Sequence, residues 1–571
     1  MSNFSLLDGG IVGVYLLVTM VAGIMVRKYV GRVEDFLVAG REMNVYLGIA
    51  SLAATEFGIV TCMYTAQSGY KYGFSGVTPG ILQALAMFVV GITGFCIKPL
   101  RDSGVMTIPE LLEKRYGQRI RWLAGVVIVL GGLLNMGVFL RIGGEFLVVV
   151  AGLSPGKLEI TMTVLLCAVA LYTILGGMLS VLITDFLQFV VMSGGLLAVT
   201  ILILVQVGWE RLADTVSAKV GEGGFDPFVH PDLGWEYVLF NLLLNTAAVL
   251  TWQTSIARVL AAKDTATGQK VYTRTSFFFV CRFLIPGLWG MAALAMLTPS
   301  SFDFLSAGMQ QDDSLYAMPI LLSTLLPVGL MGLMVAAMLA ADMSTDSAYM
   351  LTWGSVIYND ILAPFRKTKW SERRGLVWNR FIVAAIGVFL LFFGLWYELE
   401  GDVWPYLMIT GTIYLASIST LLIACCYWKG ANSWGAGAAI VLGAAIPVAF
   451  LVMQKLPATA ALANAVGPYY SGIAAYACAA LAMVLGSLLR RWFWLLLAAA
   501  GVFGVLWYSV AAVYVALRDG DRVGLLVGQH RFWFLVTAVA VVWYSTVTIY
   551  VAVRGVRDIR GMLRRLKDRQ D

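Results

Sequence analysis

The segment Val335–Trp353 reads VAAMLAADMSTDSAYMLTW, an apolar run long enough to cross a bilayer that contains two carboxylates, Asp342 and Asp346. A charged side chain at the centre of a bilayer costs roughly 3 kcal/mol or more, so such residues normally face a helix bundle or an ion or substrate path. The segment therefore predicts a buried helix in a membrane protein of several spans.

The composition of the whole chain agrees with a bilayer as its solvent. Of the 571 residues 60% are hydrophobic and 13% are charged, and the mean hydropathy is +0.83, which is typical of multi-span membrane proteins. The net charge of +7 comes from short basic clusters between apolar runs and in the tail. These clusters are better explained by membrane orientation than by nucleic acid, so we expect a lipid bilayer and no nucleic-acid partner.

The residues that would carry enzymatic or redox chemistry are scarce. The seven cysteines lie in apolar runs without metal-ligand spacing, and the two histidines, His230 and His530, lie in polar connections. We find no nucleophile–base pair, metal cluster or motif for an organic cofactor. The sequence therefore predicts a protein that is not an enzyme.

Apolar stretches of about 20 residues, each enough to cross the hydrocarbon core, predict about fifteen transmembrane helices. They lie near 9–27, 44–67, 76–98, 122–150, 158–176, 179–205, 235–262, 273–298, 316–358, 378–397, 403–428, 434–453, 468–489, 491–517 and 533–553.

Alternate connections differ in their lysine and arginine content. Those near 28–41, 101–121, 263–274 and 366–374, together with the tail, are rich in basic residues. Because basic connections stay in the cytoplasm, we expect the N-terminus outside and the C-terminus in the cytoplasm, in the cell membrane, which in a bacterium is the inner one.

Two spans have the composition of interrupted helices. Small residues surround Glu56 in the segment 53–58, and polar side chains from Asn241 to Thr254 interrupt the span 235–262. Such sequence suits unwound backbone around a cavity, and a pair of broken helices indicates a binding site near the bilayer midplane.

Further ionisable residues within the spans need an explanation besides the two aspartates. Arg141 and Glu145 are four residues apart and could neutralise each other on one helix. Arg282 could reach the cytoplasmic surface or a central cavity. Glu56 lies beside the expected break, where it could bind an ammonium group, complete a cation shell or carry a proton.

The hydroxyl residues of the opening segment form a pattern of their own. One helical face carries Ala341, Ser344, Thr345 and Ala348. Hydroxyls and the free carbonyls of a broken helix are oxygen ligands that suit Na⁺ and lack the soft atoms that select zinc or copper. The alternative is that these hydroxyls bond back to the preceding helical turn.

At this point the chain resembles a known family, the sodium/solute symporters. The resemblance rests on LAATEFG (52–58), MTIPELLEKRYG (106–117), LYTILGGMLSVLITDFLQF (171–189) and AAMLAADMST (336–345), with ARVLAAKD (257–264) and RFLIP (282–286) in support.

The resemblance implies an all-α membrane fold with a 5+5 inverted-repeat core, in which the first and sixth core helices are discontinuous. Its parts would be a leading helix at 9–27, the ten-helix core at 44–428, accessory helices at 434–553 and a basic cytoplasmic tail at 554–571.

The resemblance also implies site residues. The sodium ligands would be Ala54, Phe57, Ala341, Ser344 and Thr345. Some family members hold a second sodium, which here would use Asp185, Ser344 and Ser347, although Ala348 replaces a further hydroxyl. The substrate candidates are Glu56, Thr61, Gln83, Asn245 and Arg282.

The function implied is Na⁺-coupled uptake of a small polar organic solute by alternating access, for which a monomer suffices. Members that carry sugars have an acidic residue where this chain has Pro79 and Gly80, and an aromatic gate where it has Ala248 and Val249, which makes a sugar less favoured. Two alternatives remain open: a proton-coupled symporter that uses Glu56, and a membrane sensor that keeps the fold and signals through a separate partner.

Overall fold

The computed structural model describes residues 4–302, 313–366, 370–397, 402–488 and 558–566, and these residues are almost entirely helical. The α-helices are α1 (Leu6–Met25), α2 (Val33–Val38), α3 (Val45–Glu56), α4 (Ile59–Tyr72), α5 (Thr78–Thr93), α6 (Ile97–Asp102), α7 (Ile108–Tyr116), α8 (Gln118–Met136), α9 (Phe139–Val150), α10 (Leu158–Val207), α11 (Trp209–Val220), α12 (Gly234–Thr251), α13 (Gln253–Ala261), α14 (Thr265–Thr275), α15 (Phe278–Met296), α16 (Asp313–Leu325), α17 (Leu330–Val356), α18 (Glu372–Trp396), α19 (Val403–Tyr427), α20 (Ser433–Lys455) and α21 (Pro457–Leu488). A π-helical turn, η7 (Ile357–Leu362), continues α17.

Nine helical stretches in the described part of the chain are long and apolar enough to cross a membrane, so the protein is a multi-pass membrane protein. They are Leu6–Tyr29, Ile59–Thr93, Gln118–Val150, Leu158–Val207, Thr265–Met296, Glu372–Trp396, Val403–Tyr427, Ser433–Lys455 and Thr459–Leu488.

The predicted total of fifteen helices stays a prediction. The spans expected at 491–517 and 533–553 lie outside the described residues. The stretch 316–358 was expected as one span but consists of two helices, α16 and α17. The 50-residue α10 contains the two spans expected at 158–176 and 179–205, which meet at Gly177 with φ 54° and ψ −147°. Such a backbone conformation is accessible mainly to glycine.

Both predicted helix interruptions are present. The first separates α3 from α4 at Phe57 and Gly58. The second separates α12 from α13 at Trp252, whose ψ of 118° is extended. At each of these two breaks the chain leaves helical geometry, so that backbone carbonyls lose their partners within the helix.

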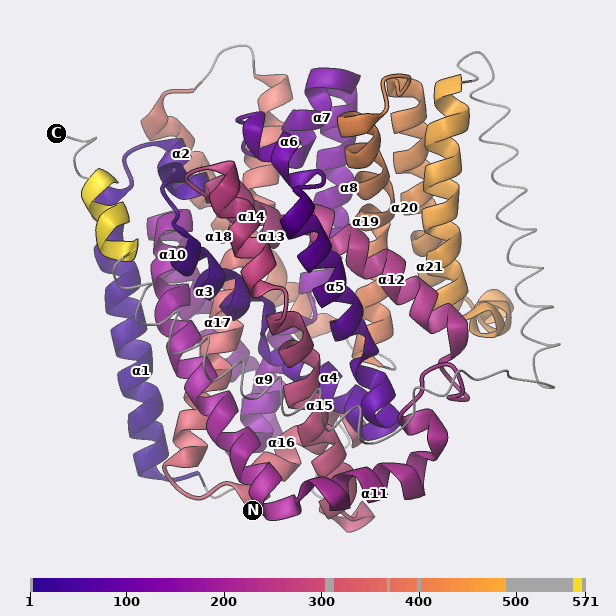
Figure 1. The fold of residues 1–571 in the computed structure, drawn as a ribbon. Helices are drawn as coiled ribbons and strands as arrows, with labels where there is room; N and C mark the ends of the chain where they lie inside the picture. Colours follow the sequence, from indigo (N-terminus) through magenta and orange to yellow (C-terminus); the bar gives the residue numbers. More distant parts are fainter. Residues whose placement is uncertain (1–3, 303–312, 367–369, 398–401, 489–557, 567–571) are drawn as a thin grey trace.

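The helix that carries the opening segment, α17, lies inside the bundle, packed against α10, α3, α1, α18, α9 and α8 (Figure 1). Its residues from Met334 to Gly354 are all buried. The prediction of a buried helix is therefore confirmed.

The broken helices also meet at one end of the bundle. Met43, which precedes α3, forms a parallel bridge with Ala262 at the end of α13. Met43 donates its N–H to Ala261 O (3.1 Å) and accepts from Lys263 N–H (3.1 Å).

Candidate functional site

The break between α3 and α4 lies directly against α17. A Cβ atom on Gly58 would be 2.6 Å from Thr345 Oγ1, closer than real Cβ contacts allow. Only glycine therefore permits the hydroxyl of Thr345 to approach the interrupted backbone this closely.

The five predicted sodium ligands are buried at this junction. Thr345 Oγ1 donates to Thr55 O (2.7 Å) and to Ala341 O (3.0 Å). Ala54 O accepts the Phe57 N–H at 3.3 Å, where the last turn of α3 tightens. The structure thus brings hydroxyl and carbonyl oxygens of α3 and α17 together, and it adds the carbonyl of Thr55, which the sequence did not single out.

Ser344, another predicted ligand, faces α10 as well as α3. Its hydroxyl donates to Asp185 Oδ1 (2.6 Å) and lies 3.3 Å from Thr55 Oγ1. Ser347 instead donates to Ser344 O (3.1 Å) within the same helix. Of the residues predicted for a second sodium site, Ser344 therefore contacts Asp185. Ser347 instead bonds back to the preceding turn of its own helix.

Asp185 has a partner that the sequence reasoning missed. Arg258 of α13 is fully buried, and its Nη2 lies 2.9 Å from Asp185 Oδ2. The guanidinium also donates to Ser51 Oγ (3.0 Å) and Thr55 Oγ1 (2.7 Å). Arg258 thus supplies the positive charge beside Asp185 that a second sodium ion would otherwise provide.

The two aspartates of the opening segment are both buried. Asp342 and Asp346 are each 1% exposed, and neither carboxylate oxygen of Asp346 has a hydrogen-bond partner in the described part of the chain. Arg141 pairs with Glu145 at 3.1 Å, as one reading of the sequence proposed. Arg141 therefore does not hydrogen-bond to Asp346.

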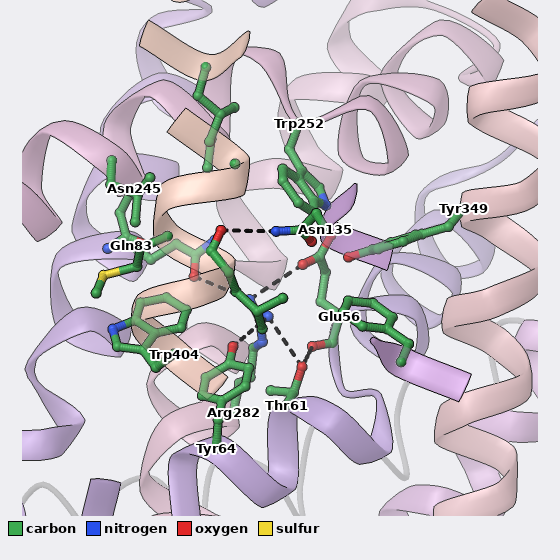
Figure 2. A pocket seen from close by; sticks show the side chains of 17 residues that line it. Glu56, Thr61, Tyr64, Gln83, Asn135, Asn245, Trp252, Arg282, Tyr349 and Trp404 are labelled. Atoms are coloured by element: carbon green, nitrogen blue, oxygen red, sulfur yellow. Dashed lines mark hydrogen bonds and ion pairs between the residues drawn. The ribbon is translucent and has the colours of Figure 1, made fainter. Parts of the chain in front are cut away.

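The predicted substrate residues come from separate helices and line one cavity (Figure 2). They are Glu56 at the end of α3, Thr61 on α4, Gln83 on α5, Asn245 on α12 and Arg282 on α15. About 70 Å³ of the cavity is open to water, which is room for several water molecules.

Glu56 and Arg282 form an ion pair at this cavity. Arg282 Nη1 lies 3.3 Å from Glu56 Oε2, and the side chains are 12% and 5% exposed, respectively. Arg282 therefore follows the cavity alternative of the sequence analysis, and it does not reach the cytoplasmic surface.

Aromatic side chains complete the walls, and none of them was predicted. Trp252 and Tyr349 pack edge-to-face with ring centroids 5.8 Å apart, and Tyr64 stacks on Trp404 at 4.8 Å. All four line the cavity. Of these four residues, only Trp252 could have been predicted from the sequence, because it lies at the expected break between α12 and α13.

Comparisons with known proteins agree with the fold and the motifs. The family model described as "Sodium:solute symporter family" matches residues 36–443. The sodium/glucose cotransporter 4 of Danio rerio is 26% identical over 478 residues, which are 78% of this chain and 72% of that protein. The sodium/mannose cotransporter SLC5A10 of Bos taurus is 26% identical over 496 residues, 80% of each chain.

A solved structure has the same fold. A Na⁺-coupled sialic acid symporter, in a substrate-bound outward-open state, matches with a TM-score of 0.70 at 18% identity and covers 85% of this chain and 98% of that chain. The family resemblance drawn from the sequence motifs is confirmed. Because the family model extends over most of the chain, the protein belongs to the sodium:solute symporter family.

Proposed function

We propose that the protein moves a small polar organic solute into the cell together with Na⁺, which binds between the α3–α4 break and α17. Family membership supports the coupling to Na⁺. The observation that carries the proposed site is the contact of Thr345 Oγ1 with Thr55 O between α17 and α3, beside Gly58. The ligands would be the carbonyls of Ala54, Phe57 and Ala341 with the hydroxyls of Ser344 and Thr345.

We propose a 5+5 core whose halves each begin with a broken helix. The first half would consist of α3/α4, α5, α8/α9 and the two arms of α10, and the second of α12/α13, α15, α17, α18 and α19. The leading helix would be α1, and α20 and α21 would begin the accessory part. With the N-terminus outside, uptake would run toward the basic connections.

The solute would bind in the cavity lined by Glu56, Thr61, Gln83, Asn245 and Arg282. The similar proteins named above are cotransporters of glucose and mannose by name. In this chain, however, Pro79 and Gly80 stand at the position of the acidic residue of sugar-carrying members, and there is no room for a side chain at Gly80. A Cβ atom on Gly80 would be 2.7 Å from Phe279 O and 2.8 Å from Phe283 Cβ. An amino-acid-like, ammonium-bearing or carboxylate compound fits the charged pair better.

The ion pair of Glu56 with Arg282 also favours Na⁺ over a proton as the coupling ion. Arg282 Nη1 lies 3.3 Å from Glu56 Oε2, so Glu56 already has a cationic partner within the protein. We therefore prefer sodium coupling to the proton-coupled alternative.

The sodium site is tested by uptake into proteoliposomes with the variants Ser344→Ala and Thr345→Ala. Each should raise the sodium concentration for half-maximal uptake by roughly tenfold or more, since each removes an oxygen that contacts a charge. Thr352→Ala is the matched control, because Thr352 lies on the same helix and donates to Ala348 O (2.9 Å) away from the break. Sodium-independent uptake that none of these changes affects would refute the site.

A further inference from the structure

We propose that the solute is a small zwitterion, whose carboxylate binds Arg282 and whose ammonium group binds Glu56. This inference rests on the proposed function and narrows its solute class. The inference follows from the long contacts between the two charged side chains, from their net charge and from the aromatic residues that line the cavity around them.

The guanidinium of Arg282 makes several long contacts and leaves one donor unused. Nη1 lies 3.3 Å from Glu56 Oε2 and from Gln83 Oε1, and Nη2 lies 3.3 Å from Thr61 Oγ1 and 3.0 Å from Tyr64 OH. Nε is buried without a hydrogen-bond partner among the described residues. Charge-assisted bonds are usually about 2.7–2.9 Å, and a carboxylate can accept two of them from one guanidinium. A carboxylate ligand would therefore satisfy Arg282 better than its present partners do.

The carboxylate of Glu56 divides its two oxygens between different neighbours. Oε1 accepts from Thr254 Oγ1 (3.0 Å) and Ser255 Oγ (3.3 Å), both at the start of α13. Oε2 faces Arg282. The hydroxyls thus hold Glu56 in place through one oxygen, while the other can exchange Arg282 for a cationic group of the ligand.

Charge balance excludes ligands that carry one charge alone. The Glu56–Arg282 pair is net neutral and buried at the cavity. An anion that displaced Glu56 from Arg282 would leave a buried carboxylate uncompensated, and a cation on Glu56 would leave the guanidinium uncompensated, both of which are costly. A zwitterion replaces the one ion pair by two and leaves no charge unpaired.

The aromatic walls suit the ammonium end and the apolar body of such a solute. Figure 2 shows Trp252 and Tyr349 on the side of Glu56, and Tyr64 and Trp404 around Arg282. Rings of this kind attract an ammonium or quaternary ammonium group and cover an apolar body. We therefore expect the solute to place an ammonium group near Glu56, and this group can be primary, secondary or quaternary.

The test is a thermal-shift assay of the full-length protein in detergent, in sodium chloride and in potassium chloride, since a ligand of the folded state raises its apparent stability. The probes are L-alanine, L-proline and glycine betaine as zwitterions, propionate as an anion, choline as a cation, and D-glucose and myo-inositol as neutral solutes. We expect one or more zwitterions to raise the unfolding temperature in sodium, and the other probes to have no effect at equal concentration.

Two variants should change the selectivity in opposite directions. Glu56→Gln should weaken zwitterion binding roughly 10- to 100-fold and admit propionate, because Arg282 is then unpaired. Arg282→Gln should weaken it similarly and admit choline. Glu56→Asp keeps the charge and should keep the preference for zwitterions, and gel filtration checks that each variant is folded. A purely structural role of the pair would not produce this crossed selectivity.

The outcomes separate the inference from the function on which it rests. Sodium-dependent binding of glucose or myo-inositol without a zwitterion response would overturn the zwitterion while leaving sodium symport intact, as would zwitterion binding unchanged in Glu56→Gln. A zwitterion response that is equal in sodium and potassium would support the charged pair and contradict sodium coupling.

Discussion

The buried ion pair between Arg258 and Asp185 predicts a large loss of folding stability when either partner is removed. Both side chains are fully buried at a separation of 2.9 Å. Asp185 also accepts from Ser51 (2.5 Å) and Ser344 (2.6 Å). Arg258→Met keeps an unbranched apolar stem but removes the guanidinium, which leaves the carboxylate of Asp185 with hydroxyl donors alone. Removing one partner of a buried pair costs about 3–5 kcal/mol, and we expect a loss of folding stability in that range.

The partner variant and the double variant supply the control. Asp185→Leu should be similarly destabilising, because it leaves the guanidinium of Arg258 buried and unpaired. In Arg258→Met with Asp185→Leu both charges are gone, and exchanging a buried ion pair for apolar groups is often close to neutral. We therefore expect the double variant to be more stable than either single variant, with a coupling energy of about 3 kcal/mol or more.

The measurement is unfolding of the four proteins in one detergent at one scan rate or denaturant series, without sodium and with saturating sodium. A double variant as unstable as the sum of the single variants would refute the pairing argument. The sodium series adds a second reading, because a cation that takes the place of the guanidinium would restore stability to Arg258→Met selectively.

Two glycine positions yield further predictions. Gly195→Ala should lower the folding stability by about 1–3 kcal/mol, since its Cβ would lie 2.5 Å from Ala337 Cβ where α10 packs on α17. The neighbouring variant Gly194→Ala meets nothing within 4 Å and should be neutral or slightly stabilising. Equal unfolding temperatures of the two variants would contradict this packing. Gly58→Ala would place a Cβ atom 2.6 Å from Thr345 Oγ1, so it should displace that hydroxyl and raise the sodium requirement for uptake. Adding Thr345→Ala should restore stability without restoring sodium affinity, and sodium titrations of uptake together with unfolding curves separate the two effects.

The parts of the site that follow from local sequence could be predicted. Small residues around Glu56 and the polar run before Thr254 indicate breaks because lipid-facing helices do not carry such residues, and both breaks are present. Helical periodicity likewise assigns Ser344 and Thr345 to the face that meets α3. These inferences need only the geometry of one helix at a time.

The parts that depend on which helices pack together could not be predicted. Arg258 lies in an apolar run and could have been flagged as a charge within the membrane, but its partner Asp185 is 73 residues away on α10. Trp404 carries no local signal at all, because its role as a cavity wall arises only when α19 packs beside α4. The pairing of Arg282 with Glu56, instead of with either aspartate of α17, is of the same kind.

The bridge between Met43 and Ala262 restricts how the molecule can change shape. It fastens the start of α3 to the end of α13, and Arg258 fastens the same two helices again through Ser51 and Thr55. Because these two attachments lie at different points along α3 and α13, we expect the two helices to move together. A rotation of α3 that moves the oxygens proposed to bind sodium should therefore also move Thr254 and Ser255, whose hydroxyls contact Glu56.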